Sequence, residues 1–139
     1  MNDLLSSPPL RALIVDDDLD SVILLTTLLE MHGVDVTSAF CADQAMQKLR
    51  SQPDILIADL AMPHIDGYDL IRQIRTLPPE QGGQIPAIAV SAWVAIEAQN
   101  KAVSAGFHTF ITKPYQLTEL LETVSQLTDW RPLESGVTA

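Results

Sequence analysis

The stretch Arg11-Ala-Leu-Ile-Val15, followed at once by Asp16-Asp17-Asp18, sets the pattern for the whole chain. A short, mostly apolar run of this kind is typical of a buried β-strand, and three consecutive carboxylates stop it abruptly. A second apolar run, from Ile55 to Ala58, ends in the same way at Asp59. We therefore expect two buried strands whose carboxyl ends carry acidic side chains.

Outward from these two strands, apolar runs alternate with stretches of helical periodicity, in which apolar residues recur at i, i+3, i+4 and i+7. Short apolar strands that alternate with helices indicate a parallel sheet covered by helices on both faces. The sequence thus predicts an α/β fold with a strand–helix unit repeated five times. The expected strands are 11–15, 35–39, 55–58, 85–90 and 109–112, and the expected helices are 20–31, 42–49, 70–77, 93–105 and 117–127.

Length and composition indicate one domain. The chain has 139 residues, of which 47% are hydrophobic, and this suffices for a single core. We expect the domain to cover residues 10–128, with an N-terminal extension at 1–9 and a C-terminal tail at 129–139.

Charge and apolar content narrow the possible partners. The formal net charge is −10, from 8 basic and 18 acidic residues, so we expect the chain to repel nucleic acid. A continuous run of about 18 apolar residues would indicate a membrane span, and the sequence contains none. The start lacks the pattern of a signal peptide, and the single cysteine, Cys41, has no partner for an internal disulfide. We therefore expect a cytoplasmic protein that binds neither nucleic acid nor membrane.

The residues at the strand ends are the candidates for chemistry, because ligands of such sheets bind beyond the carboxyl ends of the strands. Carboxylates that converge there repel one another unless a cation relieves them. Carboxylate oxygens suit Mg²⁺, with Mn²⁺ as an alternative. The residues at these ends are Asp16 and Asp17, Asp59, Ser91, and Lys113-Pro114.

Four motifs in this order resemble the receiver domain of bacterial response regulators, including the chemotaxis-regulator type. They are Val15-Asp16-Asp17-Asp18, the loop from Asp59 to Gly67, Val90-Ser91-Ala92 and Thr112-Lys113-Pro114, and the resemblance runs from about Leu10 to Leu127. It implies a flavodoxin-like, doubly wound sheet with strand order 2-1-3-4-5. It also implies a phosphoacceptor in a two-component phosphorelay.

The resemblance assigns the central role to Asp59, the nucleophile that takes a phosphoryl group from a phosphohistidine. It implies that Asp17, Asp59 and the backbone carbonyl of Ala61 hold Mg²⁺, with Asp16 helping directly or through water. Asp18 and Asp66 are instead expected to cap or order the starts of helices.

The same resemblance places further residues around the phosphoryl group. Lys113 would pair with the Asp59 carboxylate and then with the phosphate, and Ser91, beside Ala92, would bind a phosphoryl oxygen. Phe110 occupies the position of the aromatic switch, where it lacks the hydroxyl of a Tyr, so we expect a switch by packing alone or a ring already turned inward. The peptide bond before Pro114 is expected to be cis.

The expected partner is a histidine kinase or a histidine phosphotransfer protein, with an unidentified protein downstream. Exposed apolar side chains usually mark such contacts. Ile23 lies on the polar side of the first helix, and we hypothesise that it docks the donor. The start of the fourth helix and the segment after Lys113 supply the other candidates, Trp93, Val94, Ile96 and Tyr115. Few basic residues occur on the last two helices, which favours a monomer or a weak dimer.

Two positions beside the phosphate suggest that it is long-lived. Ala61, two residues after Asp59, and Trp93, two residues after Ser91, cannot use their side chains to hydrogen-bond a hydrolytic water toward the phosphate. We therefore hypothesise slow self-dephosphorylation.

Other functions remain open. One alternative is a receiver-like interaction module that is not phosphorylated, and another is a phosphohydrolase of the haloacid-dehalogenase type. The latter fits poorly, because Asp16 to Asp20 lacks the residue that follows the paired aspartates in that family. The favoured reading is not an enzyme beyond assisting its own phosphorylation and dephosphorylation. Whether the receiver stands alone or belongs to a hybrid histidine kinase is also open.

Overall fold

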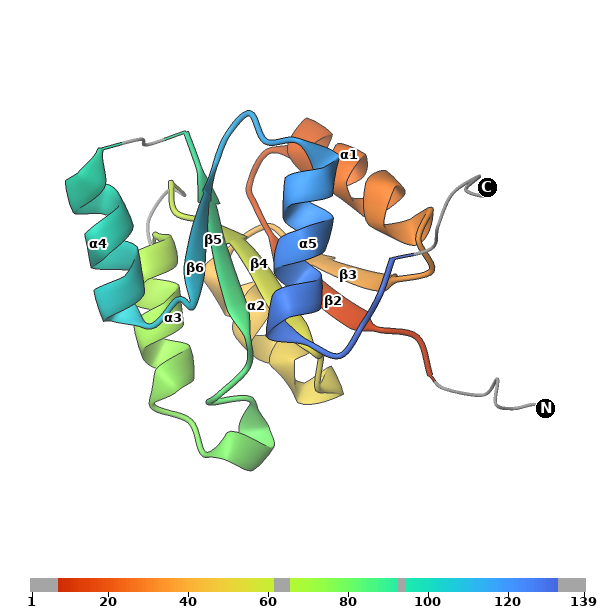
Figure 1. Ribbon diagram of the computed structural model, residues 1–139. Helices are drawn as coiled ribbons and strands as arrows, with labels where there is room; N and C mark the ends of the chain where they lie inside the picture. The colour runs from red at the N-terminus through yellow and green to blue at the C-terminus, as the bar shows by residue number, and fades with distance from the viewer. Residues whose placement is uncertain (1–7, 62–65, 93–94, 133–139) are drawn as a thin grey trace.

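Strands and helices alternate along the chain, as a computed structural model shows for residues 8–61, 66–92 and 95–132 (Figure 1). The strands are β2 (Arg11–Val15), β3 (Asp35–Ala39), β4 (Ile55–Asp59), β5 (Ala87–Ser91) and β6 (Thr109–Thr112). The helices are α1 (Leu19–Glu30), α2 (Ala42–Lys48), α3 (Gly67–Arg75), α4 (Ile96–Ala105) and α5 (Leu117–Leu127), with 3₁₀ turns η1 (Leu49–Ser51) and η2 (Pro79–Gln81).

All strand pairs are parallel, and the sheet order is β3-β2-β4-β5-β6. In chain order this is 2-1-3-4-5, so the predicted flavodoxin-like arrangement is confirmed. The register sets Val15 opposite Ala58, Asp59 opposite Val90, and Ser91 opposite Thr112. Strands β2, β4, β5 and β6 therefore finish at one edge of the sheet.

Successive residues of a strand point to opposite faces of the sheet. Each face packs against its own set of helices, so one strand contributes residues to two cores. Leu13 and Val15 belong to a core shared with α2, α3 and α4, whereas Ala12 and Ile14 belong to a core shared with α1 and α5. This explains why β2 from Ala12 to Val15 and β4 from Ile55 to Ala58 are continuously apolar rather than alternating.

Helix α4 begins later than the sequence predicts. We expected it from Trp93, but Ala95 has extended backbone angles (φ −63°, ψ 142°) and is the N-cap of a helix that starts at Ile96. Trp93 and Val94 lie outside the described residues. The apolar run there satisfied the helical pattern, although the backbone at Ala95 is not helical.

Strand β5 is shifted by comparison with the prediction. It begins at Ala87 instead of Ile85 and includes Ser91 as its last residue. Pro86 has no N–H, although its carbonyl still accepts the Leu56 N–H at 2.8 Å, just before the ladder begins. The inclusion of Ser91 fixes its backbone at the edge where the site forms.

Two aspartates cap helices, as expected. The Asp18 carboxylate accepts the Ser21 N–H at 3.2 Å and the Ser21 hydroxyl at 2.6 Å, and these bonds lower the pKa of Asp18. Asp66 accepts the Asp69 N–H at 3.0 Å at the start of α3. Both side chains satisfy N–H groups that the helix itself leaves unpaired.

Candidate functional site

Three carboxylates meet at the carboxyl edge of the sheet. Asp16 and Asp17 follow β2 directly, and Asp59 is the last residue of β4. One ligand oxygen from each lies within 4.8 Å of the other two. Asp16 is buried, with 5% of its surface exposed, whereas Asp17 is exposed. Neighbouring parallel strands thus bring together acidic residues that are more than 40 positions apart.

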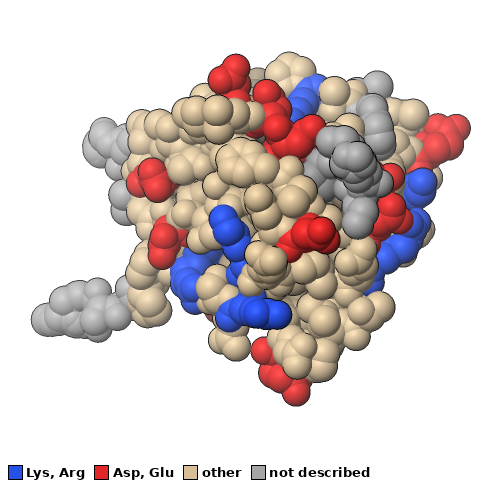
Figure 2. All heavy atoms as spheres, turned by 180° about the vertical axis from the view of Figure 1, so that it is seen from behind, with Lys and Arg blue, Asp and Glu red and all other residues tan. Residues whose placement is uncertain are grey.

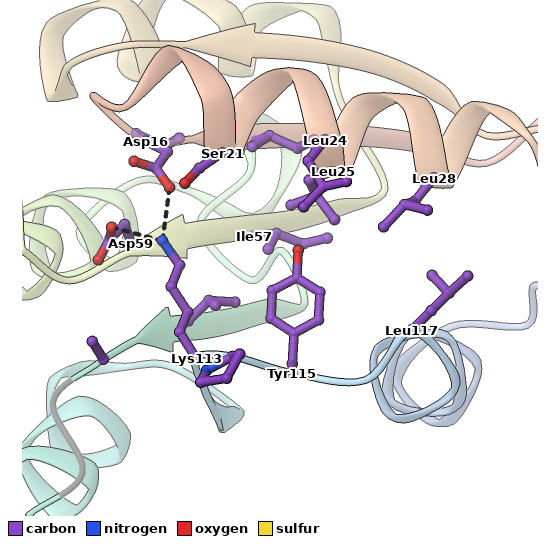
Figure 3. Close-up of a pocket in the computed structure, with 15 residues that line it drawn as sticks. Asp16, Ser21, Leu24, Leu25, Leu28, Ile57, Asp59, Lys113, Tyr115 and Leu117 are labelled. Atoms are coloured by element: carbon purple, nitrogen blue, oxygen red, sulfur yellow. Dashed lines mark hydrogen bonds and ion pairs between the residues drawn. The ribbon is translucent and has the colours of Figure 1, made fainter.

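Lys113 completes the cluster from the end of β6. Its Nζ donates to Asp16 Oδ2 at 3.1 Å and to Asp59 Oδ2 at 3.2 Å (Figure 3). Its backbone N–H donates to the Ser91 carbonyl at 2.9 Å, which ties it to β5. The Lys113–Pro114 peptide bond is cis.

The orientation of Asp59 is fixed from two sides. Oδ1 accepts the Ala61 N–H at 3.0 Å, while Oδ2 accepts from Lys113. Gly67 at the start of α3 sits so close to the end of β4 that a Cβ on it would lie 2.6 Å from the Asp59 carbonyl oxygen. A residue larger than glycine there would push the helix away from the site.

Burial and charge set the electrostatics of this site. Burial raises the pKa of Asp59 and the Asp16 charge adds to the rise, while the Ala61 N–H and Lys113 oppose it. For Lys113, burial alone would lower the pKa. The hydrogen bonds and charges of Asp16 and Asp59 outweigh burial, so the pKa of Lys113 is raised and its side chain stays protonated at neutral pH. A charged Asp59 therefore depends on cations beside it.

The donor set fits a hard divalent cation. Three carboxylates face a single ammonium among the described residues that contact them, so negative charge remains in excess. Asp16 Oδ1 accepts the Asp18 N–H at 2.9 Å, which holds that carboxylate in place. Oxygen ligands of this kind suit Mg²⁺, which usually takes one or two carboxylates in addition to water and phosphate oxygens.

The remaining predicted residues lie around this centre. Ser91 is fully buried at the end of β5, and Ala92 lines a cleft beside Lys113. Phe110 is partly buried and packs against the core on the α2, α3 and α4 side. Ala61 is exposed, and its backbone N–H donates to Asp59 Oδ1.

The docking candidates are distributed over two helices and one loop. Ile23 on α1 and Ile96 on α4 are exposed, at 53% and 64%. Tyr115 is half-buried and lines the cleft, where burial raises its pKa. Trp93 and Val94 lie outside the described residues.

Sequence reasoning missed the apolar cleft that opens beside Lys113. Its volume is about 400 Å³, and it runs between α1 and α5 (Figure 3). Leu24, Leu28 and Leu117 line it. The spacing of Leu24 and Leu28, four residues apart on α1, was the available signal, but only the position of α5 shows that a cleft forms.

The reverse face of the molecule carries charges of both signs. Among its described residues, Lys and Arg lie in small groups separated by acidic and uncharged side chains (Figure 2). None of the helices in the described parts of the chain is both long and apolar enough to cross a bilayer.

Comparison with known proteins identifies the family. The profile of the response regulator receiver domain matches residues 12–125, and the chain belongs to this family. Receiver domains are signalling modules of two-component systems, bind Mg²⁺ at an acidic cluster, and interact with histidine kinases or phosphotransfer proteins.

Individual relatives agree with this assignment. An uncharacterised 14.6 kDa protein of Leptolyngbya boryana is 42% identical over 115 residues, covering 82% of this chain and 86% of that protein. The response regulator SaeR of Staphylococcus epidermidis is 33% identical over 109 residues, and the match covers 78% of this chain but only 46% of SaeR. A putative response regulator from Chloroflexus aurantiacus has a similar structure, with a TM-score of 0.80, 32% identity, and coverage of 86% of this chain and 97% of that one.

Proposed function

We propose that this receiver accepts a phosphoryl group on Asp59 from the phosphohistidine of a histidine kinase or a histidine phosphotransfer protein. Asp16, Asp17, Asp59 and the Ala61 carbonyl would hold Mg²⁺. The observation that carries the proposal is the position of Lys113, whose Nζ contacts both Asp16 and Asp59 at the centre of the acidic cluster. The buried Asp16 and the partly buried Asp59 hold like charges close together, which costs free energy unless a cation or a function requires the arrangement.

The transfer follows from the chemistry of these groups. An Asp59 carboxylate oxygen forms a new bond to phosphorus, the P–N bond to the donor imidazole breaks, and the imidazole leaves after taking a proton from water. Lys113 neutralises charge on the phosphoryl oxygens. When bound, Mg²⁺ supplies further charge neutralisation for the same oxygens. The paired hydrogen bonds from Ala61 and Lys113 hold the carboxylate in one orientation, which lowers the entropic cost of transfer.

The phosphorylated state is then read out through Ser91 and Phe110. The buried Ser91 hydroxyl would bind a phosphoryl oxygen beside Ala92. When the Ser91 hydroxyl moves toward the phosphoryl group, the Phe110 ring would follow by packing. Its ring already contacts the core and carries no hydroxyl that would favour exposure to water. The result is altered binding of a downstream partner.

The donor docks over α1 in this proposal. Ile23 and its neighbour Leu19 are exposed on α1, whose N-cap Asp18 follows the acidic pair. Large exposed apolar side chains of this kind favour a protein contact. The exposed Ile96, together with Trp93 and Val94, would serve a second contact, and Tyr115 would border the first.

A mass measurement tests the proposal. The protein is incubated with acetyl phosphate and Mg²⁺, and the expected product carries one added phosphoryl group, which is absent from Asp59→Asn and after chelation of the metal. Aluminium-free beryllofluoride, which mimics a phosphoryl group, should protect wild type but not Asp59→Asn against unfolding. If wild type gains no mass under these conditions, the unphosphorylated interaction module is the better reading.

A further inference from the structure

The apolar cleft between α1 and α5 opens onto the proposed phosphorylation site (Figure 3). Its volume is about 400 Å³. Small-molecule sites typically span about 300–1,000 Å³ and are lined mainly by apolar side chains with a few polar groups. The apolar lining here includes Leu24, Leu28, Ile57, Tyr115 and Leu117. The space therefore suits a small organic ligand.

The two ends of the cleft differ in polarity. Asp16, Asp59 and Lys113 stand at one end, with Ser21 beside them, whereas the other end runs between α1 and α5 toward Leu28 (Figure 3). From Ser21 to Leu28 the distance along α1 is about 10 Å, at a rise of 1.5 Å per residue. A ligand that fills the cleft would have one polar head and an apolar body of about this length.

Charge at the polar end selects the sign of that head. Asp16 and Asp59 line this end with one negative charge each against the single positive charge of Lys113, and the Asp17 carboxylate lies close to both of them but outside the lining. Because the excess charge is negative, a cationic head is attracted and an anionic head is repelled. A primary ammonium has three N–H donors and no acceptor, which matches carboxylate oxygens.

We propose that this cleft binds small amphipathic ammonium compounds, with the ammonium at Asp16 and Asp59 and the apolar body along Leu24 and Leu28. The head uses the same carboxylates that would hold Mg²⁺, so the amine and the metal compete. This deepens the proposed function, because an occupied cleft would keep the receiver from binding its metal. The binding step itself does not depend on phosphorylation of Asp59.

Hexylammonium is the probe for the test, with hexanol and hexanoate as matched probes that differ only in the head. Each is titrated into the unphosphorylated protein and followed by ¹H–¹⁵N NMR. Hexylammonium is expected to bind about fivefold or more tightly than hexanoate, with shifts at Leu28, Tyr115 and Leu117. Saturating Mg²⁺ is expected to lower the affinity for hexylammonium by about fivefold or more and to change the affinity for hexanol by less than about twofold.

Two neighbouring residues on α1 provide a matched pair of variants. Leu24 and Ile23 are similarly exposed, at 57% and 53%, but Leu24 lines the cleft and Ile23 does not. Leu24→Gln is expected to lower the affinity for hexylammonium by about threefold or more, and Ile23→Gln is expected to leave that affinity unchanged. Since both side chains are exposed, neither change threatens folding.

Three results would overturn the proposal: hexanoate binding as well as hexylammonium, no competition with Mg²⁺, or equal effects of the two variants. Because no phosphoryl donor is present, these results do not depend on whether Asp59 accepts a phosphoryl group. Failure of the cleft proposal and failure of the phosphorylation proposal are therefore distinguishable.

Discussion

Lys113 Nζ lies 3.1 Å from Asp16 Oδ2, although 97 residues separate the two in the sequence. The same nitrogen lies 3.2 Å from Asp59 Oδ2. One cation thus bridges the ends of β2 and β4 from the end of β6. Both carboxylates are largely shielded from solvent, so their repulsion is screened less by water than it would be on the surface.

Replacement of Lys113 by Met should raise the pKa of Asp59 further. The change keeps a long apolar stem but removes the charge that opposes burial and the Asp16 carboxylate. Phosphorylation of the variant by acetyl phosphate should also slow, because the phosphoryl oxygens lose a cation. A ¹³C NMR titration of the Asp59 carboxyl without Mg²⁺ measures the first effect. An unchanged pKa would mean that Lys113 does not control the charge of Asp59.

Asp17→Asn should weaken Mg²⁺ binding by about tenfold or more, because it removes one of the charged oxygen ligands. Asp17 is exposed, so the substitution should leave the fold and its stability nearly unchanged. Isothermal titration with Mg²⁺ gives the affinity. Asp20→Asn, a nearby exposed acid outside the cluster, is the control and should retain wild-type affinity. Equal losses in both variants would indicate a general charge effect instead of ligation.

The arrangement of strand ends could be predicted from sequence because polar residues stand at the carboxyl ends of β2, β4, β5 and β6. Asp16, Asp59, Ser91 and Lys113 stand at such boundaries, and the order of a doubly wound sheet brings the boundaries together. The hydrogen bonds at Lys113 follow from that order, but their distances do not.

Features that depend on contacts between distant elements could not be predicted. The cleft forms between α1 and α5, which cover the same face of the sheet. The separation of the two helices depends on side-chain packing along their full length. The His108 ring accepts the Ala87 N–H at 3.1 Å, because the β5–β6 register sets His108 beside Ala87, just before the pair Ile88 and Thr109.

Stability should decrease in mild acid through His108. Burial, and then the nearby Arg75 charge, lowers the pKa of His108 below its ordinary value of 6.5. A protonated ring would lose the bond from Ala87 and face Arg75, whose Nη2 lies 3.4 Å from the same ring nitrogen. Because the folded pKa is lower than the unfolded one, the contribution is present above about pH 6.5 and is lost as the pH falls through the folded pKa.

Urea unfolding at about pH 7.5, 6.5 and 5.5 measures this effect as the difference between wild type and His108→Asn, which cannot titrate in this range. The free energy of unfolding of wild type should fall more steeply toward acid than that of the variant. Parallel curves would show that His108 titrates equally in the folded and unfolded chains.

Ile23→Glu should slow phosphoryl transfer from a phosphorylated histidine phosphotransfer protein while leaving phosphorylation by acetyl phosphate unchanged. The substitution places a charge on an exposed apolar surface, which penalises a protein contact but not a small donor. Quench-flow transfer rates and a thermal melt provide the measurements. Gln47→Glu, an exposed position on α2 at the other face of the sheet, tests whether added charge alone is responsible. Unchanged transfer by Ile23→Glu would remove Ile23 from the docking surface.

Phospho-Asp59 should be long-lived, because neither Ala61 nor Trp93 has a side-chain acceptor that could accept a hydrogen bond from a hydrolytic water and aim it at the phosphoryl group. Ala61 is exposed next to the site, so a polar side chain there would have room to reach toward the phosphate. Ala61→Asn and Trp93→Glu should each speed the loss of phosphate by about tenfold or more, with the roughly hundredfold gain of a well-positioned general base as the larger expectation. The decay is followed by mass after removal of acetyl phosphate, with Mg²⁺ present. If phospho-Asp59 decays at the wild-type rate in both variants, positions 61 and 93 do not control the phosphoryl lifetime. Shielding of the phosphoryl group from water by the residues around Asp59 and Lys113 then becomes the better explanation.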